Sequence, residues 1–224
     1  MKPITEEHLG LFRRHMTEVV DMHFELASEE IGKPAPGAAL RRALLDVPRH
    51  LFVAPQLMGV AYQDMPLPIG FDKTVSQPFI GALMIDLLDI EPGTRVLEIG
   101  TGLGYQAALL SEMGARVWSI DVVEEFVEGA SARLAALDYD VAVRVGDGSR
   151  GWAEHAPFDA ILITAAAPAP PPALLDQLKA GGRMVIPVGG KEAQQLSLIE
   201  KRLDGELMVR EIMPAHFTQL EIGA

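Results

Sequence analysis

Cysteine is absent from the 224 residues of this chain. Its absence excludes disulfides, thiolate catalysis and cysteine-based zinc sites, and it agrees with an intracellular compartment. The six histidines show no metal-ligand spacing, so we expect no metal. Long apolar runs are also lacking, because four prolines interrupt the most apolar stretch, residues 160–175. Residues 1–16 are too charged for a signal peptide, and we expect a cytoplasmic protein with no membrane partner.

Positive charge is scarce as well. Nineteen Lys and Arg residues stand against 31 Asp and Glu residues, which gives a net charge of −12, and no Lys/Arg run is longer than a pair. A chain this acidic gains nothing from a phosphate backbone, so we expect no nucleic acid partner. Apolar residues make up 49% and charged residues 22%, which is ordinary for a globular protein, and the length suits one sizeable α/β domain.

Apolar periodicity predicts the elements. Residues 4–31 are expected to form one or two amphipathic helices, residues 38–46 a short helix, and residues 47–70 a structured loop with a short strand. Ser76 is the expected N-cap of the next helix. Further along, we expect helices at 77–88, 103–113, 123–137 and 171–178, and strands at 95–99, 116–120, 141–145, 158–164, 183–188, 195–201 and 207–213.

Strands that alternate with helices imply right-handed crossovers and a mostly parallel sheet. The last two strands have only a turn between them, so they add an antiparallel edge. We therefore expect an α/β fold: a Rossmann-like, doubly wound, seven-stranded sheet with an N-terminal helical extension. Residues 1–75 would be a helical and loop region that contributes to the substrate site, and residues 76–224 the Rossmann-like domain, in one compact unit.

The strongest local motif is VLEIGTGLGYQ, residues 96–106, where a strand runs into a glycine loop and then a helix. Glycines allow positive φ and close approach of a ligand to the backbone. The dinucleotide fingerprint is G-x-G-x-x-G. Here Gly100, Gly102 and Gly104 are spaced G-x-G-x-G, with Thr101 between the first two and Glu98 two residues before them. This spacing is more like motif I of S-adenosylmethionine methyltransferases, whose glycines admit the methionine part of the cofactor.

Acidic residues follow the next two predicted strands. Asp121 lies 21 residues after Gly100 and is placed to accept hydrogen bonds from ribose hydroxyls. Asp147 and Gly148 follow the third strand, where an adenine would lie. Each feature alone has a local alternative: a tight turn for the glycines, a helix N-cap for Asp121 and an Asx turn for Asp147. Together they predict S-adenosyl-L-methionine as the cofactor.

Several stretches resemble the protein-L-isoaspartate O-methyltransferase family, in the family's order, between residues 47 and 189. They are VPRHLFV (47–53), AYQDMPLPIG (61–70), TVSQP (74–78), VLEIGTGLGYQAALLS (96–111), VGDGSRGW (145–152), APFDAILITAAA (156–167) and LKAGGRMVIPVG (178–189). The resemblance implies a repair enzyme that methylates the α-carboxylate of L-isoaspartyl residues in damaged proteins or peptides. The ester would then collapse to a succinimide that reopens partly to aspartate.

By the same resemblance, Ser76 and Thr74 would be the catalytic residues, with the Ser76 hydroxyl touching the substrate carboxylate. Tyr62 and Ile69 are candidates for the substrate groove, and Glu98 would line the methionine part of the cofactor with the glycines. The sequence departs from the family at residues 71–73, at Asp121 in place of the usual glutamate, and across residues 1–38.

The implied chemistry is an in-line displacement at a sulfonium. A carboxylate with an ordinary pKa near ~3.9 is already ionised at neutral pH, so no general base is needed. The enzyme must align oxygen with methyl carbon and exclude water. Ser76, at a helix N-terminus, would position the substrate carboxylate. Lys73 is either a solvated surface lysine or an attractor of that carboxylate.

Other interpretations remain open from the sequence. One is a methyltransferase of the same fold dedicated to a single peptide, protein or small molecule, with tRNA disfavoured by the charge. A nucleotide-dependent oxidoreductase is disfavoured by the glycine spacing, and a non-catalytic nucleotide-binding module by the retained acids and Ser76. The sequence does not determine the oligomeric state.

Overall fold

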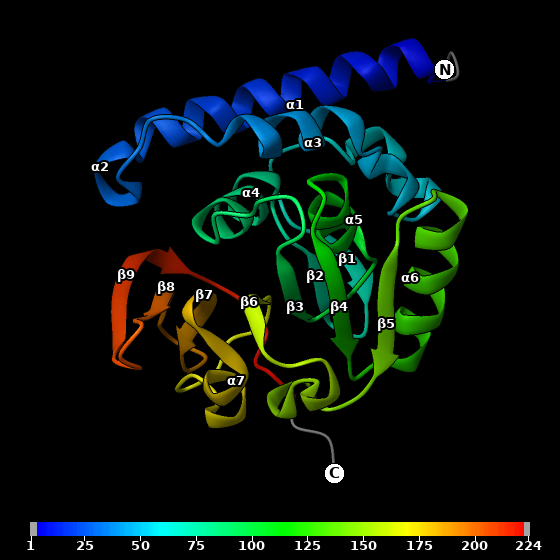
Figure 1. Ribbon diagram of the computed structural model, residues 1–224. Coiled ribbons are helices and arrows are strands. Elements are labelled where there is room, and N and C mark those ends of the chain that lie inside the picture. The colour runs from blue at the N-terminus through cyan, green and yellow to red at the C-terminus, as the bar shows by residue number, and fades with distance from the viewer. Residues whose placement is uncertain (1–3, 222–224) are drawn as a thin grey trace.

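Seven strands form the central sheet, in the order β5-β4-β3-β6-β7-β8-β9 (Figure 1). The computed structural model describes residues 4–221; residues 1–3 and 222–224, the outer ends of the two predicted regions, lie outside the described residues. The strands span Arg95–Ile99 (β3), Arg116–Asp121 (β4), Val141–Val145 (β5), Phe158–Ile163 (β6), Leu178–Gly189 (β7), Gln194–Lys201 (β8) and Leu207–Ala215 (β9).

Strands β3 to β7 pair in parallel, whereas β8 and β9 add antiparallel pairings at one edge. The predicted Rossmann-like sheet is therefore confirmed. The first strand of this sheet, β3, lies in its interior, and β4 and β5 follow on one side of it. The chain then crosses to the other side of β3, where β6 to β9 follow in order. The carboxyl ends of β3 and β6 consequently flank the topological switch point, where open α/β sheets bind their ligands.

Side chains of the central strands alternate between two cores, as expected for a sheet that is covered on both faces. One core joins the sheet to the N-terminal helices and to Pro78–Leu87 (α4), Tyr105–Glu112 (α5) and Glu124–Ala136 (α6). The other lies beneath Pro172–Gln177 (α7) and includes Leu174. Neighbouring residues divide accordingly: Val96 and Val117 face the first core, and Leu97 and Trp118 the second.

The N-terminal segment forms a long helix, Glu6–Leu26 (α1), then Ser28–Ile31 (α2) and Ala38–Asp46 (α3). Figure 1 shows α1 running across the helical side of the sheet, above α3 and α4. Its predicted amphipathic character is confirmed, because Met16, Val20 and Phe24 are fully buried at helical spacing. The chain before α3 is fixed to α4 through Asp86, which accepts a 2.7 Å hydrogen bond from the Gly37 amide and pairs with Lys33.

Residues 47–77 contain 3-10 turns at Arg49–Leu51 (η1) and Pro55–Val60 (η2), followed by the hairpin of Leu67–Gly70 (β1) and Lys73–Val75 (β2). One short strand was expected here, and the second was missed. The prediction that Ser76 caps the following helix is wrong, since the N-cap of α4 is Gln77 with Pro78 at the first position. The Asp64 side chain instead accepts from a first-turn amide, that of Phe79, at 2.8 Å.

Candidate active site

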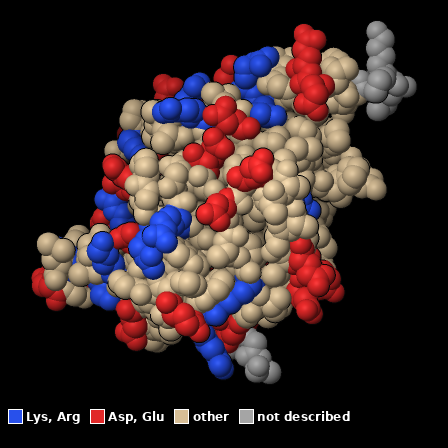
Figure 2. Space-filling view, turned by 45° about the vertical axis from the view of Figure 1, so that its right-hand side comes forward, with Lys and Arg blue, Asp and Glu red and all other residues tan. Residues whose placement is uncertain are grey.

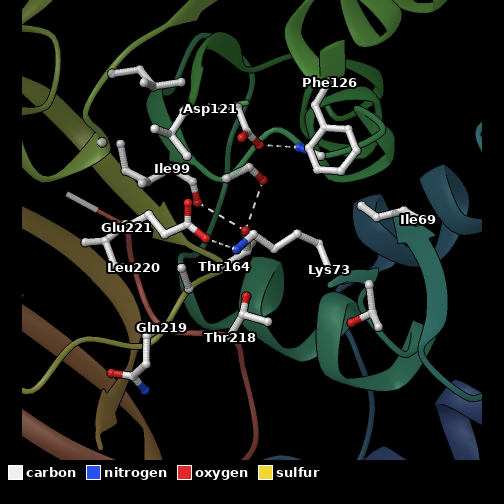
Figure 3. A pocket seen from close by; sticks show the side chains of 17 residues that line it. Ile69, Lys73, Ile99, Asp121, Phe126, Thr164, Thr218, Gln219, Leu220 and Glu221 are labelled. Carbon is white, nitrogen blue, oxygen red and sulfur yellow. Dashed lines mark hydrogen bonds and ion pairs between the residues drawn. The ribbon is translucent and has the colours of Figure 1, made fainter. Parts of the chain in front are cut away.

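A cavity opens at the carboxyl ends of β3, β4 and β6, at the switch point of the sheet (Figure 3). The strand ends form its floor, the β1–β2 hairpin and α6 contribute one wall, and the C-terminal segment contributes another. The lining residues are Ile69, Lys73, Thr74, Ile99, Gly100, Gly102, Ile120, Asp121, Val122, Phe126, Gly148, Thr164, Ala165, Thr218, Gln219, Leu220 and Glu221. Ile69, Gly100, Gly102, Asp121 and Gly148, all predicted site residues, are thus brought together here.

The glycine loop has the conformation that its sequence predicts. Gly100, Gly102 and Gly104 have φ values of +95°, +51° and +86°. At Gly100 a Cβ atom would lie 2.2 Å from the Thr164 hydroxyl oxygen, so no other residue fits without a shift. That hydroxyl donates toward the carbonyls of Ile99 and Gly100 at 3.1 and 3.0 Å. The loop is therefore held against the end of β6, with its backbone facing the cavity.

Asp121 ends β4 and joins the loop to the start of α6. One carboxylate oxygen accepts from the Gly102 amide at 2.8 Å and the other from the Val123 amide at 3.0 Å. A carboxylate has about four lone-pair sites, so it keeps acceptor capacity for a ligand. The side chain that orders the loop is thus also available to ribose hydroxyls in the cavity.

Glu98 lies behind the loop and does not line the cavity. Its carboxyl is fully buried and accepts a hydrogen bond from the Ser119 hydroxyl, which in turn lies 2.6 Å from the Thr101 hydroxyl. Burial, and to a lesser degree the charge of Asp121, raises the pKa of Glu98 to about 8. Glu98 and Thr101 therefore support the loop from beneath, a different position from the cofactor-facing one expected for them.

Asp147 forms the Asx turn that was its local alternative: one carboxylate oxygen accepts from the amide and the hydroxyl of Ser149 at 2.9 and 2.7 Å. The other oxygen is buried and has no hydrogen-bond partner among the described residues. Gly148 lines the cavity, and a Cβ there would lie 2.3 Å from the Ile99 side chain. The nearest cation to that Asp147 oxygen is Arg150, whose Nε lies 3.5 Å away in an ion pair. A carboxylate oxygen with spare acceptor capacity beside this glycine wall fits a ligand with an N–H donor.

A second, larger cavity adjoins the first and has a volume of about 710 Å³. It shares Thr74, Thr164 and Thr218 with the first cavity, and its lining includes Ser76. Of the two predicted catalytic residues, Thr74 thus lies where the two spaces meet, and Ser76 lines the second space. The remaining lining residues are Pro66, Asp72, Gln77, Ile80, Pro214, Ala215, His216 and Phe217.

Ser76 is held from behind by Arg49, which the sequence interpretation did not single out. The buried guanidinium donates to the carbonyls of Ser76 and Ala61, each at 2.8 Å, and lies over the Tyr105 ring, 4.7 Å from its centroid. Burial lowers the pKa of the Arg49 guanidinium. A basic pair, Arg49 and His50, inside the otherwise apolar motif VPRHLFV was the available signal.

Asp64 is a second positioning residue that was missed. Its carboxylate accepts from the Phe79 amide and from the Gln77 side chain at 2.7 Å, and lies 2.9 Å from His23 Nδ1. Gln77, which follows Ser76, and the first turn of α4 are therefore fixed to the loop at 61–66, and through His23 to α1.

Tyr62 does not line the two cavities as expected. Its ring is buried, and its hydroxyl points toward His50 Nδ1 at 2.7 Å and Arg13 Nε at 3.2 Å. Burial accordingly raises the pKa of the Tyr62 hydroxyl. Its role is to connect the VPRHLFV segment with α1. Ile69, the other expected groove residue, instead faces the first cavity across from Gly102.

Lys73 extends over the first cavity and forms an ion pair with Glu221 of the C-terminal segment (Figure 3). Its side chain is only 20% exposed, so it is not a freely solvated lysine. Beside it, Phe71 packs edge-on against Phe126 of α6, with ring centroids 5.3 Å apart. We call these two contacts, Lys73 with Glu221 and Phe71 with Phe126, the clasp.

The clasp leaves little room beneath it. The first cavity has a volume of about 80 Å³, whereas small-molecule sites typically measure roughly 300–1,000 Å³. The floor consists of strand ends inside the sheet. The C-terminal wall is held by two backbone hydrogen bonds with Ala166, to the Thr218 carbonyl and from the Leu220 amide. The Gln194 side chain adds two hydrogen bonds with the Phe217 backbone. The clasp and the C-terminal segment therefore cover a cavity that is smaller than a typical small-molecule site.

Comparisons with known proteins agree with this geometry. The profile of the protein-L-isoaspartate(D-aspartate) O-methyltransferase (PCMT) family matches residues 34–222. Protein-L-isoaspartate O-methyltransferase 2 of Syntrophobacter fumaroxidans is 48% identical over 220 residues, covering 97% of this chain and 89% of the relative.

Two solved structures are similar as well. A protein-L-isoaspartate O-methyltransferase superposes with a TM-score of 0.80 at 27% identity, covering 93% of this chain and 66% of that one. A Plasmodium falciparum protein in complex with S-adenosyl-L-homocysteine has the same fold, with a TM-score of 0.71 at 22% identity over 83% of this chain and 91% of that one.

Proposed function

The chain belongs to the protein-L-isoaspartate(D-aspartate) O-methyltransferase family, and we propose that its two joined cavities hold the cofactor and the isoaspartyl residue side by side. The family activity is S-adenosylmethionine-dependent methylation of isoaspartyl residues for protein repair. The observation that carries the assignment of residues is the junction of the cavities, where Thr74 and Thr164 are shared and Ser76 lies on the acceptor side.

The residues of the first cavity fit S-adenosylmethionine. Asp121 would accept from the ribose hydroxyls, and the buried Asp147 oxygen that pairs with Arg150 would accept from the adenine amino group past Gly148. The backbone at Gly100 and Gly102 would follow the methionine part, with Ile69 opposite. Glu98, Thr101 and Gly104 would act on the cofactor indirectly, by holding this loop in shape.

S-adenosylmethionine, when bound, supplies a methyl group on a positively charged sulfur; the carbon–sulfur bond breaks as the new carbon–oxygen bond forms. The acceptor carboxylate is ionised at neutral pH, so the chain provides orientation and exclusion of water rather than a base. Ser76 would hold the carboxylate through its hydroxyl, and Thr74 would close the junction on the hairpin side. Arg49 would hold Ser76 in position through its hydrogen bond to the Ser76 carbonyl.

The partners proposed for the site are proteins or peptides that carry L-isoaspartyl residues. The second cavity, at about 710 Å³, is large enough for a peptide residue and its neighbours. Figure 2 shows Lys and Arg side chains interspersed with Asp and Glu on the visible face, which does not favour nucleic acid. In the described residues no helix is both long and apolar enough to cross a membrane. We place the enzyme in the cytoplasm on the absence of cysteine.

The test is a matched pair of peptides, one with isoaspartate and one with aspartate at the same position, incubated with S-adenosylmethionine. Release of S-adenosylhomocysteine with the isoaspartyl peptide alone is the expected result. If S-adenosylmethionine binds and neither peptide reacts, the general repair substrate is wrong. The alternative of a dedicated protein or small-molecule acceptor would then take its place.

A further inference from the structure

A third cavity continues from the substrate cavity toward the N-terminal helices. It has a volume of about 490 Å³ and shares Gln77, Ile80 and Pro214 with the cavity that contains Ser76. Its outer wall is formed by Leu26, Ala27 and Glu30, at the end of α1 and in α2. We call this space the outer groove; its other lining residues are His23, Phe79, Ile212 and Met213. It leads from the acceptor site to the surface.

Side-chain contacts between different elements fix the outer groove on two sides. His23 of α1 lies 2.9 Å from the Asp64 carboxylate, and its ring packs edge-on against Phe79 at a centroid distance of 5.0 Å. On the far side, Arg210 of β9 donates to the carbonyl of Ile31 at 3.3 Å, which fixes α2 against the edge strand. Figure 1 shows α2 and β9 on the same side of the molecule. A surface held in this way is preorganised, which favours binding.

The lining is mostly apolar, with one acid at its edge. Leu26 is 75% exposed, the highest value among the exposed large apolar residues of α1. Covering an exposed leucine with a ligand removes apolar surface from water, which favours binding. Glu30, exposed beside it, adds a negative charge. The chemistry of the groove therefore suits a segment that presents an apolar side chain next to a basic one.

A peptide that delivers its isoaspartyl carboxylate to Ser76 must leave the acceptor cavity, because its neighbouring residues extend by about 3.3 Å each. The outer groove continues directly from that cavity. Its outer wall lies before residue 34, where the match to the family profile begins. The wall therefore lies outside the family profile, in a segment that this chain shares with relatives whose match covers 97% of it, such as the Syntrophobacter fumaroxidans protein.

We propose that the outer groove is a subsite for the residues flanking isoaspartate on one side, and that it prefers an apolar residue followed or preceded by Lys or Arg. The subsite rests on the proposed function, since the occupant is the methyl-accepting polypeptide itself. Residues 1–75 would then contribute to substrate choice through α1 and α2, in addition to the hairpin.

The test compares a minimal isoaspartyl peptide with peptides extended on either side by Leu-Lys, Leu-Glu or Ser-Ser. The wild-type kcat/KM is expected to be highest with Leu-Lys on one side. Leu26→Ala is expected to lower that value about fivefold, the order expected for loss of part of an apolar contact, and to leave the minimal peptide unaffected. Glu30→Arg is expected to invert the preference between Leu-Lys and Leu-Glu.

The matched control is Leu11→Ala, which removes a leucine that is 54% exposed on the same helix and lines none of the cavities described. Equal kcat/KM values for all extensions, or equal effects of Leu26→Ala on minimal and extended peptides, would overturn the subsite while the methylation activity stands. If the minimal peptide is not methylated at all, the proposed function fails, and the subsite fails with it.

Discussion

Ser76 depends on its neighbours for its position, because Arg49 binds its carbonyl and Asp64 fixes the side chain of Gln77. Ser76→Ala removes only the hydroxyl and leaves those contacts in place. We expect kcat/KM for isoaspartyl peptides to fall by about 100-fold, the scale of losing one oriented hydrogen bond to a reacting group. The affinity for S-adenosylhomocysteine, measured by calorimetry, should stay unchanged. A decrease of only a few fold would deny the hydroxyl a central role.

Glu98 leads to a prediction about folding. Because burial raises its pKa to about 8 from an ordinary 4.5, the folded protein keeps a proton that the unfolded chain releases between these values. The free energy of unfolding should therefore decrease as pH rises through this window. Glu98→Gln, which cannot ionise, should remove that decrease and be the more stable protein at about pH 8.

Urea denaturation of both proteins at about pH 5 and about pH 8 measures this difference. The two proteins should have similar stability at the lower pH and diverge at the higher one. Parallel pH profiles would show that Glu98 ionises in the folded state with an ordinary pKa.

At the scale of residues, local motifs were predictable and long-range partners were not. The glycine loop and Asp121 follow from one stretch of sequence, since strand, loop and helix are consecutive. The positions of Arg49 and Tyr62 depend on Ser76, Arg13 and His50, and the contact with Arg13 joins residues 49 positions apart. Pattern alone does not determine which polar group in an apolar motif is turned inward.

The tip of the β1–β2 hairpin is fastened by the clasp in addition to its own strand pairing. Phe71 and Asp72, at the turn, have φ values of +52° and +54°, a region that non-glycine residues rarely adopt. This turn has no glycine at either central position, which is why the hairpin was not recognised from the usual turn residues. Three elements, α3, β3 and β5, were predicted to the residue, whereas most others differ by one or two residues at an end and β7 begins five residues earlier than predicted.

Weakening the clasp should speed cofactor exchange. The Lys73–Glu221 pair is partly exposed, with Glu221 56% exposed, so its contribution is at most about 1 kcal/mol. Lys73→Gln and Glu221→Gln should each raise the dissociation rate of S-adenosylhomocysteine by about two- to fivefold. Stopped-flow displacement measures this rate. The double exchange Lys73→Glu with Glu221→Lys should return it toward the wild-type value.

Arg202→Gln is the matched control, because it breaks an ion pair with Glu206 that lies in the turn between β8 and β9. Its dissociation rate should equal that of the wild type. Unchanged rates in both clasp variants would mean that exchange is limited by another wall of the cavity.

At the scale of the whole molecule, the fold follows from the order of elements. Alternating strands and helices imply parallel crossovers, and the break in strand order between β3 and β6 determines where ligands bind. The joining of two cavities at Thr74 and Thr164 could not be predicted, because it depends on how the hairpin and the C-terminal segment fold over the sheet edge. Lys73 and Glu221 are 148 positions apart in the sequence, and they come into contact only in the folded chain.

The most direct test of the central claim is a crystal structure of the complex with S-adenosylhomocysteine and an isoaspartyl peptide. We expect the cofactor product along Gly100, Gly102 and Asp121, and the isoaspartyl carboxylate within hydrogen-bond distance of the Ser76 hydroxyl, facing the cofactor sulfur. A peptide carboxylate bound away from Ser76, or a cofactor product outside the first cavity, would contradict the account.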